Sequence, residues 1–505
     1  MNISEYRDHF ASFNSSLELA RYDYHVGLTT TVNHHEIFDR YSDLFRLESI
    51  DELKAHLELT SSDFGIEIRG LQKLLSAAQI RHVQLQVREL ASELARCESA
   101  TSIQWRGEQL STKDVAARLV RESKPQRVEL GARWVDSISA CDELRLSHRA
   151  SVNEVARSLG FDSYCELMFR GAETNVDEIQ SAAQQLLEQT ESEYKSALGR
   201  LVARELPDVR LSDLDYADLP YLAAAPWLDK YLPAQKTLRT HKETMSGLGI
   251  RVDQQLNLKI DSTPGSSQKP VAACFPVQPP EDVRLALRLN GGAAEFLNGQ
   301  QQSGKAQHYA WCSKELAKRH PEFVYSLDTA TADGFGYLFK YLTLDPKWIL
   351  EFLPEIESVR AEIITRDVAM QMALDLRHLC ADLLFEISVC DENQSPEQLQ
   401  STYVDLYERA TSFSIRPESF LLNLENRIPR DCHLRALAFS FGLREYLRVR
   451  YGHRWWASRK AGDELIDLWS TASQYSVEEL ASLIGFGEVS FDLLAETINM
   501  TLSGA

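Results

Sequence analysis

The spacing of apolar residues along the chain predicts a mainly α-helical protein. In the run 70–98, apolar side chains recur at three- and four-residue intervals, which is the pattern of an amphipathic helix. The run 176–205 is rich in Ala, Gln, Glu and Leu and ends before Leu206-Pro207, so it predicts a second long helix. Comparable helical patterns occupy residues 367–389, 396–412, 431–451 and 490–505.

A small sheet is predicted in the middle of the chain. Short apolar runs at 256–261, 272–277 and 283–288 have the length and composition of strands. They are separated by the turn-rich stretch 262–270 and by Gln278-Pro279-Pro280. A separate hairpin is predicted at 102–110, where an alternating pattern turns at Arg106-Gly107.

The length of the chain bears on its domain organisation. At 505 residues it exceeds the size at which one hydrophobic core keeps growing, so two or more lobes are expected. We predict an N-terminal helical lobe at 1–175 and a second helical domain at 176–505 that contains the small sheet. The eight Cys are scattered without C-x-x-C pairs, which predicts reduced thiols.

Charge and hydropathy narrow the classes of partner. The chain has 74 acidic and 54 basic residues, and the resulting formal charge of -20 argues against binding to a nucleic-acid backbone. The first residues lack the basic and apolar regions of a signal peptide, and no apolar run is long enough to cross a membrane. We therefore expect a cytoplasmic protein without a nucleic-acid or membrane partner.

The stretch Gly299 to Trp311 has the frame of a zinc-binding helix without its ligands. In H-E-x-x-H, two His one helical turn apart bind zinc, and the Glu between them activates the metal-bound water. Here that frame reads Gln301, Gln302, Ser303, Gly304 and Lys305. A carboxylate ligand would come from the next helical segment, 330–339, which offers Asp333.

The residues around this altered frame resemble those of a known family. They are Gly291-Gly292, the run 306–310, Asp333-Gly334-Phe335, Leu342-Thr343, the run 345–348 and, outside the core, the runs 159–164 and 248–250. On these residues the chain resembles the oligoendopeptidase-like zinc peptidases of the thimet and oligopeptidase F type, in particular their shorter bacterial relatives. The resemblance implies a two-lobed helical (gluzincin) fold with a deep channel, and a small sheet beside the degenerate site helices at about 296–345. Both His, the catalytic Glu and the Glu ligand are replaced, so the resemblance implies the fold but not the activity.

The replacements argue against a metal site. Gln is a poor zinc donor, and a Lys ammonium cannot bind zinc until it loses its proton, so we expect no metal and no other cofactor. Asp333 lies 28 residues after Lys305, near the position of the family's carboxylate ligand. We predict that Lys305 and Asp333 form an ion pair in place of the zinc–carboxylate contact, since either charge alone in a buried site would be costly. The alternative is that both side chains are solvated.

Two histidines complete the set of candidate catalytic residues, which is Lys305, Asp333, His308 and His433. His308 lies three residues after Lys305 and therefore on the same face of the helix, where many members of the resembled family carry a His. The resemblance also places an oxyanion-binding Tyr near the C-terminus, and the segment 427–436 puts His433 at that position.

The candidate ligand-binding residues are Gln301, Gln302, Tyr309, Tyr337 and Arg435. Arg435 lies one helical turn after Asp431, so a purely structural ion pair is the alternative for it. Residues 299–305 also spell the phosphate-binding frame G-x-x-x-x-G-K, but Ala306 stands where that frame requires Ser or Thr and no buried strand precedes it. We therefore exclude a nucleotide-binding loop.

Three functions are compatible with these residues. The first is a metal-free pseudopeptidase that binds a peptide-like or small acyl ligand in the inherited channel. The second is a repurposed enzyme, of specialised metabolism for example, that uses the altered site for acid–base or covalent chemistry without a metal. The third is a protein-interaction scaffold. In the resembled family the outer strand of the sheet binds substrate backbone by strand addition, whereas here that role and a structural one both stay open.

Overall fold

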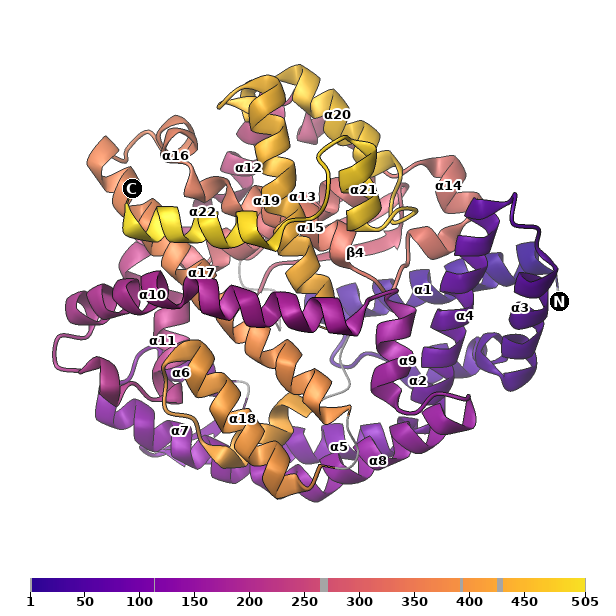
Figure 1. The fold of residues 1–505 in the computed structure, drawn as a ribbon, viewed down its shortest axis with the longest axis horizontal. Coiled ribbons are helices and arrows are strands. Elements are labelled where there is room, and N and C mark those ends of the chain that lie inside the picture. The colour runs from indigo at the N-terminus through magenta and orange to yellow at the C-terminus, as the bar shows by residue number, and fades with distance from the viewer. Residues whose placement is uncertain (1, 113, 264–270, 391–393, 425–429, 505) are drawn as a thin grey trace. The chain divides into compact units, whose positions relative to one another are not determined.

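The computed structural model describes residues 2–112, 114–263, 271–390, 394–424 and 430–504 (Figure 1). Helices make up most of the regular structure, which confirms the predicted mainly α class. The helices predicted at 176–205, 396–412 and 431–451 are present as α10 (Val176–Glu205), α18 (Pro396–Thr411) and α19 (Asp431–Tyr451). Among the described residues, none of the helices combines the length and apolarity that crossing a bilayer requires.

The chain forms two compact units, and each is built from several separate segments. The first unit comprises Met1–Gln79, Leu228–Val368 and Cys432–Leu494, and the second comprises Ile80–Trp227, Ala369–Asp431 and Ala495–Ala505. The structure therefore does not divide at the boundary predicted between residues 175 and 176, which lies inside the second unit. Long helices cause this interleaving, because α4 (Gly65–Gln86), α17 (Ser358–Val389) and α22 (Phe491–Ser503) each contribute residues to both units.

The remaining α-helices belong to one unit each, except α19, which begins at Asp431 in the second unit and continues in the first from Cys432. Those of the first unit are α1 (Ile3–His25), α2 (His34–Arg40), α3 (Leu47–Leu59), α12 (Thr237–Gly247), α13 (Ala293–Ala310), α14 (Lys314–Arg319), α15 (Ala330–Lys340), α16 (Pro346–Phe352), α20 (Arg459–Ser470) and α21 (Val477–Leu483). Those of the second unit, besides α10 and α18, are α5 (Arg88–Ala100), α6 (Val115–Leu119), α7 (Lys124–Ile138), α8 (Asp142–Ser158), α9 (Tyr164–Gly171) and α11 (Leu219–Ala224).

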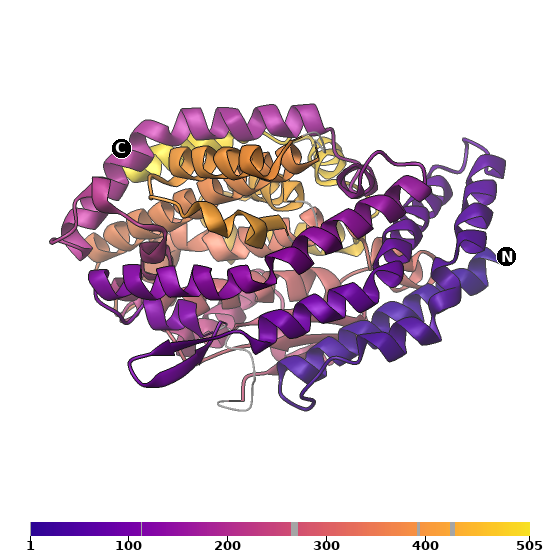
Figure 2. The ribbon, with the colours of Figure 1, turned by 90° about the horizontal axis from the view of Figure 1, so that it is seen from below.

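The predicted sheet and hairpin are both present. The sheet in the first unit has the strand order β3 (Leu258–Asp261), β5 (Asp282–Ala286), β4 (Ala273–Gln278), with β3 parallel and β4 antiparallel to β5. Of the predicted turn 262–270, residues 264–270 lie outside the described residues. The hairpin pairs β1 (Ser102–Trp105) with β2 (Glu108–Ser111) in the second unit and is seen at the lower left of Figure 2. Arg106 and Gly107 both have positive φ, as tight hairpin turns require.

Two expectations need correction, one about the helix at 70–98 and one about the cysteines. The run 70–98 is not one helix, because α4 ends at Gln86 and α5 begins at Arg88 after Val87, whose φ of -99° and ψ of 8° interrupt the helix. The apolar periodicity continues across this break and so could not reveal it. The eight cysteines are not all reduced thiols, since Cys97 is bonded to Cys141 and Cys165 to Cys390. The bonded cysteines are 44 and 225 residues apart, so no local sequence motif predicts these two disulfides.

The first unit places its candidate site where α13 crosses α15, beside β4 (Figure 1). A Cβ at Gly304 would lie only 2.8 Å from the carbonyl oxygen of Phe335, and one at Gly336 only 2.9 Å from the carbonyl oxygen of Gln301. No other residue type fits at either position without moving backbone. The two glycines therefore let the helices approach closely, which brings Lys305 on α13 opposite Asp333 on α15.

Candidate functional site

Lys305 and Asp333 form the predicted ion pair. The Nζ of Lys305 lies 2.7 Å from Oδ1 of Asp333, and the two side chains are only 19% and 4% exposed. Burial lowers the pKa of Lys305, but the charge and hydrogen bond of Asp333 outweigh it, so the pKa is raised overall. Burial likewise raises the pKa of Asp333, but Lys305 and His433 outweigh it, so the pKa is lowered overall. Both partners are therefore charged at neutral pH.

His433 on α19 is the third member of this group. Its Nδ1 lies 3.6 Å from the second carboxylate oxygen of Asp333, and its side chain is 35% exposed. Of the aligned segment 427–436, residues 427–429 lie outside the described residues. The structure thus brings together three of the four candidate catalytic residues in direct contact. The role of His433 as a donor to a ligand oxygen stays a prediction.

His308, the fourth candidate, lies one turn further along α13 and is fully enclosed. Its ring stacks on Phe335 at 5.4 Å between ring centroids and meets the ring of Tyr309 edge-on. Burial, with a smaller contribution from the charge of Lys305, lowers the pKa of His308 to about 3. The imidazole is therefore neutral at physiological pH and has no proton to donate from a charged form.

The buried neutral state of His308 predicts a pH dependence of stability. An unfolded His takes up a proton below its ordinary pKa of about 6.5, whereas folded His308 does not do so until about pH 3, so its contribution to stability is lost progressively as the pH falls. Between about pH 7.5 and about pH 5 this costs roughly 2 kcal/mol. We expect urea denaturation of His308→Gln to show about that much less loss over the same range, while the exposed control His9→Gln follows the native protein. Parallel pH curves for His308→Gln and the native protein would show that His308 is protonated in the fold.

Gln302 and its neighbours on α13 occupy the outer edge of the sheet. The Oε1 of Gln302 accepts a hydrogen bond of 3.1 Å from the backbone N–H of Cys274, and Asn298 donates one of 3.1 Å to the carbonyl of Ala272. Pro276, the next residue on the same side of β4, has no N–H to offer. Side chains of this chain thus hold two of the polar groups to which an added strand would bind, which favours the structural role of the sheet over strand addition.

Of the remaining candidates, Gln301 lies against the second glycine of the crossing, and its side chain is half-buried. Tyr309 is half-buried beside His308, and burial raises the pKa of its phenol, which keeps it protonated. Tyr337, one turn after Asp333 on α15, stacks on Tyr341 at 5.9 Å between ring centroids. These three residues stay candidates for ligand contact.

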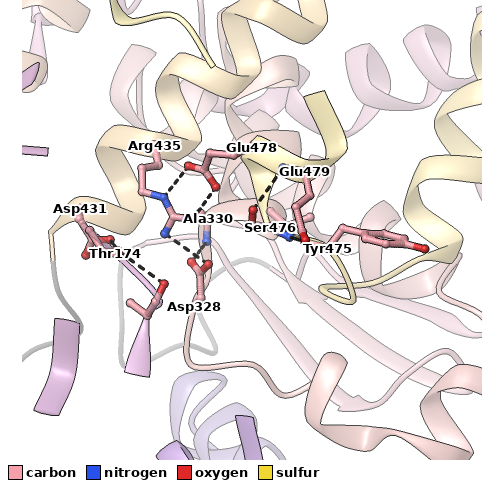
Figure 3. Close-up of polar contacts among 11 residues, drawn as sticks. Thr174, Asp328, Ala330, Asp431, Arg435, Tyr475, Ser476, Glu478 and Glu479 are labelled. Atoms are coloured by element: carbon pink, nitrogen blue, oxygen red, sulfur yellow. Dashed lines mark hydrogen bonds and ion pairs between the residues drawn. The ribbon is translucent and has the colours of Figure 1, made fainter. Parts of the chain in front are cut away.

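Arg435 has a structural role. Its guanidinium donates hydrogen bonds of 2.8 Å to each carboxylate oxygen of Glu478 on α21 and one of 3.3 Å to Asp328 (Figure 3). Asp328 in turn accepts from the N–H of Ala330 at the start of α15. Arg435 therefore connects α19, α21 and the beginning of α15. The structural alternative for Arg435 is supported, with partners that its sequence neighbourhood did not reveal.

The sequence interpretation missed a buried amide network on the other side of α13. Gln307 is fully buried, exchanges hydrogen bonds of 3.0 and 3.1 Å with Gln255, and accepts one of 3.1 Å from the indole N–H of Trp311. Cys274 was missed as well, although its thiol lies in the electrostatic neighbourhood of Lys305 and burial raises its pKa to about 12. Cys274 is a neighbour of the site only because β4 lies beside α13 in the folded chain.

Comparison with known proteins defines the fold of the whole chain. No family model matches it, and no curated protein matches it. Among solved structures it is similar to the one described as "BsuCP Crystal Structure", with a TM-score of 0.64 over 99% of this chain and 98% of that chain at 11% identity. A structure of PZ peptidase A with an inhibitor matches with a TM-score of 0.63 over 94% of this chain and 88% of that chain at 13% identity. The fold is peptidase-like. At these identities the likeness concerns the fold alone.

The residues of the candidate site do not suit zinc. A zinc site needs three or more His, Cys, Asp or Glu ligands at coordination distance. Within the described ranges, no group of three or more such side chains could hold a metal ion. Beside the α13–α15 crossing, Asp333 and His433 are of ligand type, but the ammonium of Lys305 already holds the carboxylate.

Proposed function

We propose that this chain is a metal-free pseudopeptidase, derived from the oligoendopeptidase-like zinc peptidases, and that its altered site binds a short peptide-like or small acyl ligand. The observation that carries the proposal is the position of Lys305. Its ammonium contacts Asp333 at 2.7 Å, on the two helices whose counterparts would hold the zinc ligands. A permanent positive charge thus replaces the metal ion in neutralising the carboxylate.

Exposure of the neighbouring polar groups supports binding. Gln301, Gln302 and Lys305 are half-buried, and the side chain of His433 is 35% exposed. Two amides, an imidazole and an ammonium can all donate hydrogen bonds to a carbonyl oxygen. Because Asp333 compensates Lys305, the site favours a polar neutral group, such as the carbonyl of an acyl or amide function, over a second carboxylate.

The edge of the sheet supports a short ligand over an extended one. The N–H of Cys274 is taken by Gln302 and the carbonyl of Ala272 by Asn298. An extended peptide that added itself to β4 would have to break both contacts and would find no N–H donor at Pro276. A ligand that bonds to the side chains of α13 and α19 avoids this cost.

The protonation states favour binding over metal-independent catalysis. A catalytic Lys acts as a base or nucleophile only when its pKa is lowered toward neutrality, whereas the pKa of Lys305 is raised. His308 is neutral and stacked on Phe335, with its pKa lowered to about 3, so it is not poised to exchange a proton near pH 7.

Binding of two peptides of different length tests the proposal. We expect N-acetyl-alanyl-alanine amide, which is uncharged, to bind measurably in isothermal titration, and an acetylated and amidated octa-alanine peptide with added lysines for solubility to bind no more tightly. Gln301→Ala should lower the affinity for the short ligand by about fivefold to tenfold, which is the effect of one lost neutral hydrogen bond. The exposed residue Gln254 supplies the matched control, Gln254→Ala, which should leave affinity unchanged.

Two results would overturn the proposal. One is the absence of saturable binding of the short ligand, or equal binding by Gln301→Ala. The other is one tightly held zinc per chain after dialysis against zinc and then against buffer, measured by elemental analysis. We expect less than about a tenth of an equivalent of zinc, because the site lacks three ligands.

A further inference from the structure

The second unit contains a small cavity that is separate from the site described above. It has a volume of about 190 Å³ and lies between α6, α7 and the segment 215–220. Nearly all of the surface that faces the cavity is hydrocarbon. The apolar side chains that line it include those of Leu119, Val135, Leu219 and Pro220.

The polar groups beside the cavity are engaged by the chain itself or enclosed by it. The backbone N–H of Asp215 donates a hydrogen bond of 3.0 Å to the carboxylate of Asp218, and the N–H of Ala217 donates one of 2.9 Å to the carboxylate of Asp215. The Nε1 of Trp134 is enclosed by the protein, so the indole of this wall residue presents ring carbons to the cavity. The wall therefore offers a ligand mainly apolar contact.

Packing between α7 and the segment 215–220 holds this wall in place. A Cβ at Gly131 on α7 would lie only 2.7 Å from the Cβ of Ala217, so the glycine allows the two elements to approach closely. The Nε of Arg127, also on α7, donates a hydrogen bond of 2.8 Å to the carboxylate of Asp218, and both side chains are almost fully buried. The cavity is thus formed before any ligand enters, as small-molecule sites usually are.

We propose that this cavity binds a small neutral aromatic hydrocarbon of about the size of benzene or toluene. The size fits, since an apolar cavity of about 150 Å³ in another protein takes up benzene. Such a ligand supplies dispersion contacts to side chains that lack partner atoms on the side of the cavity, and it has no hydrogen bonds to lose. Ala116 on α6 lines the cavity and is exposed, so a ligand can enter there.

Water and charged molecules are less suitable occupants. A buried water molecule needs two to four polar partners, and apolar cavities of this kind stay dry. A charged ligand would lose its hydration on entry, and a hydrocarbon wall does not compensate that loss. A neutral hydrocarbon has no such cost.

Binding of toluene, compared with binding of phenol, tests the inference on the full chain. The two molecules have nearly the same shape, but phenol carries a hydroxyl in place of the methyl group, and that hydroxyl would be buried without a partner. We expect isothermal titration to show saturable binding of toluene with a Kd of about 1 mM or tighter, and binding of phenol that is at least about fivefold weaker. This comparison uses the native protein and does not depend on the folding of a variant.

Filling the cavity is the second test. Ala116→Phe adds a ring at the exposed end of the cavity and should lower the affinity for toluene at least about tenfold, because the new side chain takes the place of the ligand. The matched control is Ala117→Phe, since Ala117 is also exposed on α6 but does not line the cavity. It should bind toluene as the native protein does.

Three results would show that the inference is wrong. The first is the absence of saturable toluene binding up to the solubility limit of toluene. The second is binding of phenol as tight as that of toluene, and the third is equal toluene binding by Ala116→Phe and Ala117→Phe. None of these results bears on the α13–α15 site, whose ligand is tested with a different probe.

Discussion

Replacing Lys305 with alanine should destabilise the protein by about 3 kcal/mol, because it leaves the carboxylate of Asp333 buried without its partner. The loss of a surface lysine costs far less, since an exposed ion pair contributes only about 0 to 1 kcal/mol. Urea denaturation at neutral pH measures the difference. The matched control is Lys54→Ala, because Lys54 lies in the same unit, pairs with Asp51 at 3.5 Å and is 43% exposed.

The double change Lys305→Ala with Asp333→Ala separates a true pair from two independent losses. If the two side chains form an ion pair, replacing Asp333 as well removes the unpaired buried carboxylate. The double variant should then regain part of the stability lost in Lys305→Ala. The contact of His433 with Asp333 limits this recovery, since that imidazole also loses its neighbour. Strictly additive losses in the double variant would show that the two side chains are not coupled.

Introducing the residues of the zinc-peptidase frame should create zinc binding without peptidase activity. The fourfold variant Gln301→His, Gln302→Glu, Lys305→His and Asp333→Glu rebuilds the ligand set on α13 and α15, which the glycine crossing already holds close together. We expect about one zinc per chain. Hydrolysis needs more, because a positioned donor to the developing oxyanion accounts for about a hundredfold to a thousandfold in rate in a well-studied protease, and supporting contacts to the ligands for about another tenfold to hundredfold.

The structure explains why this variant should stay inactive. The Nδ1 of His433 faces the carboxylate at position 333 from 3.6 Å, so this nitrogen is not positioned as an oxyanion donor. The carbonyl of Ala272 at the edge of the sheet stays held by Asn298, which the variant keeps. A quenched-fluorescence library of short peptides, assayed with and without zinc, measures the activity. The control is the threefold variant that keeps Gln302, which should bind zinc equally well. Robust zinc-dependent cleavage by the fourfold variant alone would mean that the site was silenced only recently.

The sequence was sufficient for the features that depend on local pattern. Helical periodicity gave α10, α18 and α19, and the metallopeptidase-like frame predicted the Lys305–Asp333 ion pair that the structure confirms. It could not predict contacts between segments far apart in the chain. The bond between Cys165 and Cys390 and the pairing of Arg435 with Glu478 depend on how helices pack, which no spacing rule encodes. The edge of β4 is a similar case. The sequence suggested that Gln302 contacts a ligand, whereas in the structure its side chain accepts a hydrogen bond from the backbone N–H of Cys274.

The close crossing of α13 and α15 makes the charge pair vulnerable to mutation at positions that carry no charge. A change from Gly to Ala requires only one nucleotide substitution, yet the added methyl group would lie 2.8 Å from a backbone oxygen at Gly304 and 2.9 Å from one at Gly336. The helices would have to separate, and the attraction between Lys305 and Asp333 falls as their distance grows. Natural variants at these two glycines would therefore alter the electrostatics of the site while every titratable residue in it remained intact.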